Sequence, residues 1–270
     1  MNGQKQIAMK RFLLFVAALA IVGCANRPNF HDNQVIAHRG AWKNTGHPQN
    51  SLASFRAAAE MGCHGSECDV HLTVDDSLVV THDPTYNDLV IENATYADLI
   101  KKPLKNGEKL PTLREYIAFV KKQTGTKLII DVKKIGSDEH CIAIGVATAK
   151  LVKEMKAEPW VEYLVAHLPT GEAIRKISSC PIAYLGRWRD ELPDMHPDTM
   201  QMRGITAVDY QDIHYQNHPD WIDTFRKRGV HLNAWTINSE EGMTWFLDRK
   251  FDYITTDNPE RLLERVKTGK

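Results

Sequence analysis

An alternation of short apolar runs with helix-like stretches, which continues from residue 34 to the end, constrains the fold of this chain more than any other feature. The apolar runs cover residues 34–37, 66–73, 128–132, 163–166, 182–185, 207–210, 231–235 and 253–255. Most of them are apolar at consecutive positions, which is typical of strands covered on both faces in a parallel sheet. Eight such strands in 270 residues predict an α/β fold of the TIM (β/α)8 barrel type.

The main rival to the barrel is a doubly wound open sheet. Many such sheets bind phosphate groups with a Gly-rich loop directly after the first strand, and no loop of the Rossmann or P-loop type follows that strand here. The sequence therefore favours the barrel. Helices are expected at residues 50–61, 113–122, 141–155, 171–177, 221–228, 240–248 and 260–267.

A small insertion is expected after the second strand of the barrel. A turn at residues 75–77 sends residues 78–81 back beside that strand, and residues 84–110 then form an irregular excursion. The sequence thus predicts one TIM-barrel domain over residues 34–270, preceded by a polar linker at residues 25–33.

The N-terminus carries a second signal. Lys10 and Arg11 precede the apolar run 12–22, which is shorter than the roughly 20 residues needed to span a bilayer. The run leads through glycine into Cys24 and resembles the lipobox of bacterial lipoproteins, so residues 1–24 are predicted to be a signal peptide ending in a lipidated cysteine. We therefore expect a membrane partner through this anchor and a place in the bacterial cell envelope, facing the periplasm or the exterior. A buried apolar segment with an incidental cysteine is the alternative.

The charge balance narrows the possible partners. Lys plus Arg and Asp plus Glu both total 34, so the formal net charge is zero and no global field favours nucleic acid. Any phosphate group must therefore be bound by a local site. The four remaining cysteines lack the spacing of a zinc site and are interpreted as small core residues: Cys63, Cys68, Cys141 and Cys180. The sequence leaves the oligomeric state open.

Two acidic residues of the second strand point to a metal site. Glu67 and Asp69 lie two positions apart, so both project from one face while Cys68 points to the other. Two carboxylates inside a barrel rarely both stay charged without a cation, and a divalent ion with oxygen ligands explains the pair most simply. An exposed edge strand is the alternative. His71 lies on the same face and is interpreted as a rim residue or as support for the ligands.

Other strand ends bring further candidates to the same end of the barrel, where barrel enzymes place their reacting groups. His38 and Arg39 follow the first strand, and His82 ends the run that returns beside the second strand. Asp131 and Lys133 lie on one face of the third strand; Asp131 is a candidate third oxygen ligand and Lys133 a fixed positive charge. Taken singly, the His-Arg pair also fits a solvated turn and the lysine a solvated strand end.

These candidate residues indicate a function more clearly together than any of them does alone. A divalent cation with an arginine and a lysine stabilises charge that builds on phosphate oxygens. One histidine can take a proton from the attacking oxygen, and the other can give a proton to the departing alkoxide. Imidazole suits both roles because it exchanges its proton near neutral pH. The set predicts a metal-dependent phosphodiesterase.

At this point the chain resembles the glycerophosphodiester phosphodiesterase family. The resemblance rests on an ordered set of motifs spread over the chain after the N-terminal segment. They are Ala37-His38-Arg39-Gly40, Pro48-Gln49-Asn50-Ser51, Gly65-Ser66-Glu67-Cys68-Asp69-Val70-His71-Leu72-Thr73, His82-Asp83, Leu110-Pro111-Thr112-Leu113, Ala234-Trp235-Thr236-Ile237-Asn238 and Ile254-Thr255-Thr256-Asp257-Asn258-Pro259.

The resemblance implies a TIM barrel that hydrolyses small glycerophosphodiesters to glycerol 3-phosphate and an alcohol, with one divalent cation, Mg²⁺ or Ca²⁺. It also implies a role for each matching residue. His38 and His82 match the acid/base pair, Glu67 and Asp69 the metal ligands together with Asp131, Arg39 and Lys133 the phosphate-binding positions, and Trp235 an aromatic residue of the pocket. For Trp235 a simple place in the core is the alternative.

The chain departs from the family pattern at two positions. The family usually has Glu where Gln49 stands, and Glu where Asp131 provides the third ligand. The shorter Asp131 side chain requires the ion to lie closer to its strand or to use a bridging water. Residues 84–110 fall where the family carries an insertion, and we expect them to shape the alcohol side of the pocket.

These departures leave other functions open. The first is an envelope binding protein that keeps the barrel and the metal without turnover. The second is a phosphodiesterase that acts on intact phospholipid or on a sugar phosphodiester, which a membrane anchor makes reasonable.

Overall fold

The computed structural model describes residues 28–187 and 195–269. Within them, eight parallel strands form a closed barrel, because the last strand of the chain pairs with the first. The barrel strands are β1 (Val35–Ala37), β2 (Gly65–Leu72), β6 (Lys127–Val132), β7 (Val161–Val165), β8 (Ile182–Gly186), β9 (Ala207–Gln211), β10 (His231–Trp235) and β11 (Tyr253–Thr256). Each pairs with the next in this order, and β1 also pairs with β2. The predicted TIM barrel is confirmed.

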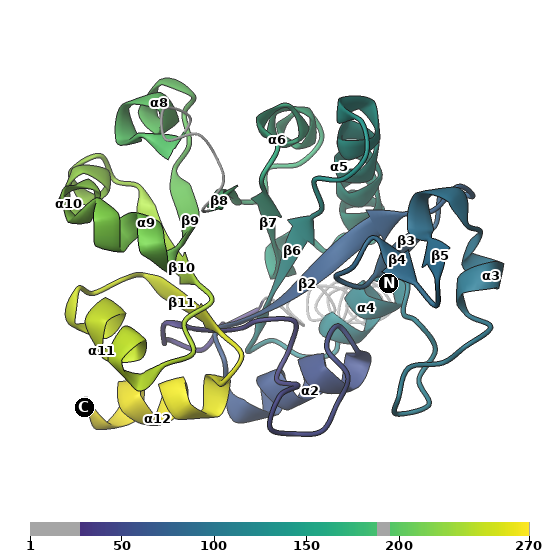
Figure 1. Ribbon diagram of the computed structural model, residues 1–270, viewed down its shortest axis with the longest axis horizontal. Coiled ribbons are helices and arrows are strands. Elements are labelled where there is room, and N and C mark those ends of the chain that lie inside the picture. The colour runs from purple at the N-terminus through teal and green to yellow at the C-terminus, as the bar shows by residue number, and fades with distance from the viewer. Residues whose placement is uncertain (1–27, 188–194, 270) are drawn as a thin grey trace, which may run out of the picture.

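The helices form a ring outside the strands (Figure 1). The ring consists of α2 (Leu52–Met61), α4 (Leu113–Val120), α5 (Asp138–Glu154), α6 (Leu168–Arg175), α8 (Pro197–Met202), α9 (Asp212–Asn217), α10 (Pro219–Lys227), α11 (Glu240–Asp248) and α12 (Pro259–Thr268), with a short 3₁₀ helix η2 (Glu158–Trp160) before β7. Side-chain caps fix several helix starts: Ser51 accepts a hydrogen bond from the Ser54 amide, and Thr112 forms a capping box with Glu115.

The strands are buried on both faces, as their apolar sequences predict. All residues of β2 are buried, and its outward-facing Cys68 and Val70 pack in the layer between strands and helices. The inward-facing side chains form a separate apolar layer in the barrel, which includes Ile36, Ile129 and Leu164. This layer lies below the site, and the same three residues also border a second cavity of about 530 Å³ toward the N-terminal ends of the strands.

The inward face changes from apolar to polar toward the C-terminal ends of the strands. In β6, Ile129 belongs to the apolar layer, whereas Asp131, two residues later on the same face, is buried above it. The parallel pairing of β2 with β6 sets Asp69 directly beside Asp131. The register of two neighbouring strands therefore creates the acidic cluster.

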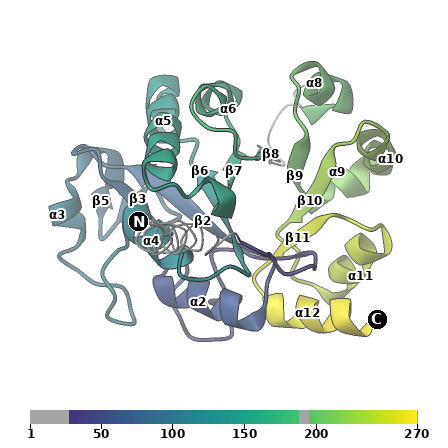
Figure 2. The same ribbon diagram turned by 180° about the vertical axis from the view of Figure 1, so that it is seen from behind.

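The predicted insertion follows β2. Strand β3 (Leu78–Val80) returns antiparallel to β2, and a two-stranded sheet of β4 (Thr85–Tyr86) and β5 (Leu89–Val90) comes next. A short 3₁₀ helix η1 (Ile91–Asn93) and helix α3 (Tyr96–Leu99) complete it. The insertion projects beside the ring of helices in both views (Figures 1 and 2).

Three helices were missed by the sequence prediction, α3, α8 and α9, and α5 and α6 begin earlier than residues 141 and 171. The missed helices are short, with four residues in α3 and six each in α8 and α9, so their apolar periodicity is weak. Helix α5 begins at Asp138 because Ser137 caps its first turn, a signal that lies before the apolar residues of the helix. The four cysteines interpreted as core residues are buried and unbonded to one another, which confirms that interpretation.

The expected signal peptide and Cys24 lie outside the described residues. In the described part of the expected linker, the amides of Asn29 and His31 donate hydrogen bonds to the carbonyls of Thr124 and Gly125, so this segment is attached to the barrel. Among residues 28–187 and 195–269, no helix has the length and apolar character needed to cross a bilayer.

Candidate active site

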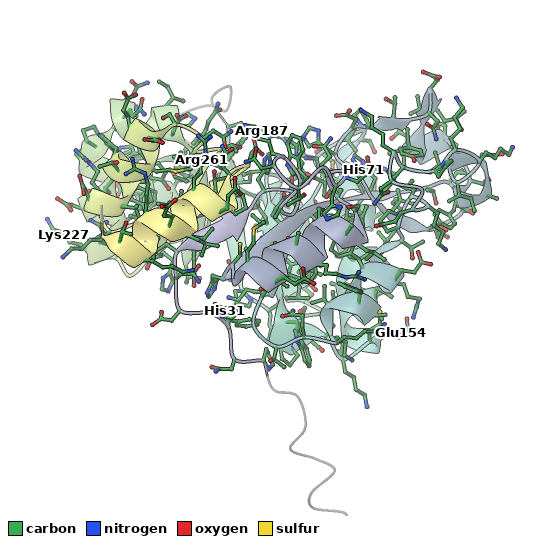
Figure 3. All side chains as sticks on the ribbon, turned by 90° about the horizontal axis from the view of Figure 1, so that it is seen from below. His31, His71, Glu154, Arg187, Lys227 and Arg261 are labelled. Carbon is green, nitrogen blue, oxygen red and sulfur yellow. The ribbon has the colours of Figure 1, made fainter. Side chains whose placement is uncertain are left out.

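A cavity of about 240 Å³ opens at the C-terminal ends of the barrel strands. Every site residue predicted for the barrel lines it. Its lining consists of His38, Arg39, Glu67, Asp69, His82, Asp131, Lys133, Leu164, Leu185, Arg187, Asp209, Trp235 and Thr255. Figure 3 places Arg187 and His71 toward the upper edge of that view, whereas His31 lies toward the lower edge. The cavity therefore lies at the end of the barrel where the strand-end argument placed the site.

Three carboxylates form the acidic wall of this cavity. Glu67, Asp69 and Asp131 are 3%, 1% and 5% exposed, and one oxygen of each lies within 4.8 Å of the others. Burial raises the pKa of Glu67 well above its usual range, and the nearby charges of Asp69 and Asp131 raise it further. A cation bound beside Glu67 therefore stabilises the ionised form of its carboxyl group.

The donor set fits a hard divalent cation. All three ligands offer carboxylate oxygen, which Mg²⁺ and Ca²⁺ prefer. In addition, Oδ1 of Asp131 is buried and has no hydrogen-bond partner among the described residues. A buried carboxylate oxygen without a partner is costly, so the geometry fits an ion held by these residues.

Lys133 lies between two of the carboxylates. Its Nζ donates to Oδ1 of Asp69 and to Oδ2 of Asp131, each at 2.9 Å. Burial alone would lower the pKa of Lys133, but the charges of Asp131 and Asp69 outweigh it and raise that pKa above its usual range. Lys133 is therefore a fixed positive charge inside the cavity, as predicted from its strand position.

Arg39 is held in place by three contacts. Its amide donates to Oε2 of Glu67 at 2.8 Å, its Nη1 donates to Oε1 of Gln49 at 2.9 Å, and its Nε lies 3.5 Å from Oδ2 of Asp69. The next residue must be glycine, because its φ is +82° and a Cβ there would lie 2.4 Å from Oγ of Ser54. Gln49, which stands where the family usually has Glu, accepts the Arg39 hydrogen bond through a neutral amide oxygen.

Asn50 is a site residue for which the sequence analysis assigned only a helix start. Its Nδ2 donates to Oδ2 of Asp69 at 2.7 Å, and its Oδ1 accepts from the Asp69 amide at 3.1 Å. Burial raises the pKa of Asp69, but Lys133 and Arg39 outweigh it, and the Asn50 hydrogen bond helps to hold that pKa well below its usual range. The position of Asn50 in the Pro-Gln-Asn-Ser motif is the sequence feature that could have predicted its place in the site.

His38 is oriented by residues from the end of the chain. Its Nδ1 lies 2.7 Å from Oδ1 of Asp257, whose Oδ2 accepts from Nδ2 of Asn238 at 2.8 Å. Burial raises the pKa of Asp257, but the hydrogen bond and charge of His38 outweigh it, and the pKa is lowered overall. The family motifs in the sequence contain Asp257 and Asn238, but the resemblance implied no role for either residue.

His82 has a carboxylate partner of its own. Its Nδ1 lies 2.8 Å from Oδ1 of Asp83, and its backbone carbonyl lies 3.1 Å from Nε2 of His71. Burial lowers the pKa of His82 from its ordinary value, and the charge of Lys133 lowers it further, despite the opposite effect of Asp69. His71 is itself 2% exposed and contacts the backbone of His82. It therefore supports a site residue and does not lie at the rim of the cavity.

The remaining wall of the cavity is mostly apolar. Trp235 is half-buried, lines the cavity and donates its Nε1–H to the carbonyl of Asp209 at 3.1 Å. Its place is therefore in the pocket, as the resemblance implied. Arg187, at the end of β8, and Asp209 also line the cavity, and the sequence analysis missed both. No residue of the segment 84–110, all of which is described, lines the cavity, and its expected role on the alcohol side of the pocket stays a prediction.

Comparison with known proteins places this site in a family. A model of the glycerophosphoryl diester phosphodiesterase family matches residues 38–261. The chain is 28% identical over 248 residues to the glycerophosphodiester phosphodiesterase of Caldanaerobacter subterraneus, covering 87% of this chain and 98% of that protein. It is 37% identical over 259 residues to human glycerophosphodiester phosphodiesterase 1, covering 83% of this chain and 77% of that protein.

A solved structure agrees with these relatives. The crystal structure of a glycerophosphodiester phosphodiesterase from Parabacteroides distasonis has a TM-score of 0.82 and 35% sequence identity to this chain. The match covers 89% of this chain and 99% of that one. The chain therefore belongs to the glycerophosphoryl diester phosphodiesterase family of enzymes, as its motifs predicted.

Proposed function

We propose that the protein hydrolyses glycerophosphodiesters to glycerol 3-phosphate and an alcohol, with a divalent cation and two histidines. The observation that carries this proposal is the shared cavity: three clustered carboxylates, three cationic side chains and two histidines with carboxylate partners line one space. The name shared by the relatives supports the reaction class. Binding without turnover would not require both histidines to carry oriented ring nitrogens.

The cation would be held by Glu67, Asp69 and Asp131. When bound, a divalent cation supplies positive charge for the phosphate oxygens and stabilises the negative charge that builds on them during the reaction. Either Mg²⁺ or Ca²⁺ suits three carboxylate ligands. The partnerless Oδ1 of Asp131 supports its use as the third ligand in place of the usual Glu.

Arg39 and Lys133 bind the phosphodiester. Both are cationic side chains, and both are anchored by carboxylates of the metal site. The Arg39 guanidinium is also fixed by Gln49, which limits the entropy lost when substrate binds. These cations therefore hold the phosphorus atom next to the acidic cluster.

His38 and His82 move the protons. In each, Nδ1 is bonded to an aspartate, so Nε2 remains for exchange with the substrate. One imidazole removes the proton of the attacking water while its oxygen bonds to phosphorus, and the other protonates the alcohol oxygen as its bond to phosphorus breaks. The proton balance closes when the two histidines exchange their protons with solvent.

A second part of the proposal concerns location. We propose that the mature chain is anchored at Cys24 to the envelope membrane, because a basic flank, an apolar run and a Gly-Cys end precede the barrel in order. The test is fractionation of cells that express the wild type or Cys24→Ser. The wild type is expected in the membrane fraction and the variant in the soluble fraction; equal membrane association of both would contradict the anchor.

The substrate class is tested with a panel of diesters. Glycerophosphocholine, glycerophosphoethanolamine, an intact phospholipid and a sugar phosphodiester are each incubated with purified protein and Mg²⁺ or Ca²⁺, and the released phosphomonoester is identified. We expect glycerol 3-phosphate from the first two at rates well above the others. Faster cleavage of the phospholipid or the sugar diester would change the substrate class and leave the reaction type in place.

A further inference from the structure

One acid on the wall of the active-site cavity is left without a role by the proposed chemistry. Asp209 lies on β9, where parallel pairing sets it beside Leu185 of β8 and Asn233 of β10. Two residues of the cavity lining that contact or pair with it, Leu185 and Trp235, carry apolar side chains. An aspartate among such side chains requires an explanation.

Asp209 is deeply buried and lines two cavities. Asp209 is only 2% exposed, and its Oδ1 has no hydrogen-bond partner among the described residues. It also borders a second cavity of about 530 Å³ in the N-terminal half of the barrel, so it lies at the floor of the active-site cavity. A buried carboxyl oxygen without a partner costs free energy unless a ligand supplies the missing hydrogen bond.

The missing partner is not accounted for by the metal site. Within the described chain, the acids whose ligand atoms cluster within 4.8 Å of one another are Glu67, Asp69 and Asp131. Asp209 is not a member of this cluster, although the charge of Asp131 acts on it. Nε1 of Trp235 donates to the backbone carbonyl of Asp209 at 3.1 Å. This hydrogen bond joins the acid and the indole, and both line the active-site cavity.

We propose that Asp209 binds a hydroxyl group of the substrate's glycerol moiety and selects diesters that carry this polyol. This inference rests on the proposed function, since it names the part of that substrate which the floor of the cavity holds. The glycerol is common to all glycerophosphodiesters, whereas the alcohol varies and suits the open mouth. A buried polar group on the floor excludes analogues that lack the hydroxyl, because binding them leaves the group unpaired.

The protonation state of Asp209 does not alter this role. Burial raises its pKa well above the usual range, and the charges of Asp131 and Glu162 raise it further. A neutral carboxyl both donates to and accepts from a hydroxyl, and a carboxylate accepts from one. Either state therefore makes the hydrogen bond.

The test compares two substrates that differ only in these hydroxyls: glycerophosphoethanolamine and the diester in which propyl replaces glyceryl. For Asp209→Leu, we expect the ratio of kcat/KM for the glyceryl to the propyl substrate to fall about tenfold or more. For Asp209→Asn, which keeps a hydrogen-bonding group, this ratio is expected to lie between those of Asp209→Leu and the wild type. Glu162→Gln is the matched control, since Glu162 lines only the second cavity and pairs with Lys127 at 3.0 Å; its ratio should match the wild type.

Binding of the product provides a readout that does not need turnover. In calorimetry with Mg²⁺ present, the wild type should bind glycerol 3-phosphate more tightly than propyl phosphate, and Asp209→Leu should lose that preference. An unchanged substrate ratio together with an unchanged binding preference in Asp209→Leu would overturn the inference, as would a tenfold loss of Mg²⁺ affinity, which would make Asp209 a metal ligand. If the wild type releases no glycerol 3-phosphate yet prefers it in binding, the proposed function fails while the role of Asp209 stands.

Discussion

Nδ1 of His38 lies 2.7 Å from Oδ1 of Asp257, although the two residues are 219 positions apart in the chain. The contact depends on barrel closure: β1 pairs with β11, and each of these residues directly follows its strand. Asn238 fixes the carboxylate with hydrogen bonds to its side chain and its backbone amide. The carboxylate thereby holds one ring nitrogen of His38 and leaves the other to the substrate.

Asp257→Asn is therefore expected to lower kcat by about 10²-fold, because the amide can hold His38 in the wrong tautomer, with little change in KM. Steady-state kinetics on glycerophosphoethanolamine measure this effect. Asp138→Asn is the control, since Asp138 forms another aspartate–histidine contact, 3.3 Å from His167, outside the cavity lining. Equal kcat values for Asp257→Asn and the wild type would show that His38 needs no carboxylate.

Asp131 is predicted to bind the cation despite its short side chain. Asp131→Asn should weaken Mg²⁺ and Ca²⁺ binding by at least about tenfold in calorimetry, because a neutral amide oxygen replaces a carboxylate ligand. Asp131→Glu restores the usual family residue and should keep the affinity within a few fold. If Asp131→Asn binds both ions as tightly as the wild type does, the third ligand is another group.

Lys133 is expected to compensate for the acidic cluster when the ion is removed. Lys133→Met should lower the free energy of unfolding of the chelator-treated protein by about 3 kcal/mol, since Asp69 and Asp131 lose their buried partner. Saturating Mg²⁺ should recover more stability in the variant than in the wild type. Lys127→Met is the control, because the Lys127–Glu162 pair lies at the other end of the barrel.

Denaturant titrations with and without Mg²⁺ provide these free energies. The same Mg²⁺-induced stabilisation in Lys133→Met and the wild type would contradict the idea that the lysine and the cation neutralise the same carboxylates.

His71 makes folding stability depend on pH. Burial lowers its pKa from 6.5 to about 4 in the folded protein. The unfolded chain therefore takes up a proton at this residue near pH 6.5, while the folded chain does not until about pH 4. This contribution to stability is complete above pH 6.5 and is lost as pH falls toward 4, by on the order of 3 kcal/mol.

His71→Gln removes this titration, so its free energy of unfolding should fall less than that of the wild type between pH 6.5 and pH 4.5. Comparing the two proteins cancels the other titrating groups, including His64, whose pKa is also lowered by burial. Parallel curves for the two proteins would show that His71 does not take up its proton on unfolding.

The sequence was informative where a local pattern decides the geometry. The two-residue period of a strand placed Glu67 and Asp69 on one face, and parallel strands bring their C-terminal ends together. These two rules suffice to predict the acidic cluster with Asp131 and Lys133. The order of β strands around the barrel, which follows from the repeated βα unit, required no further information.

The parts that could not be predicted depend on distant neighbours or on unusual backbone. The partner of His38 becomes evident only when β11 closes the barrel against β1. Asn50 reaches Asp69 because Arg39 and Asn50 both adopt positive φ angles, of 56° and 59°, which no periodic pattern encodes. Asp209 was hidden inside a strand that reads as apolar, and its importance comes from the cavity beside it.

The central claim is tested most directly by the metal dependence of glycerol 3-phosphate release. Purified protein is treated with a chelator, incubated with glycerophosphoethanolamine, and then given Mg²⁺ or Ca²⁺ in parallel, with His38→Gln and His82→Gln as comparisons. We expect no release after chelation, restored release with one of the two ions, and a loss of at least about 10²-fold in either histidine variant, whose ion binding stays intact. Equal release with and without the ion, or tight binding of the diester with no release under any condition, would contradict the account.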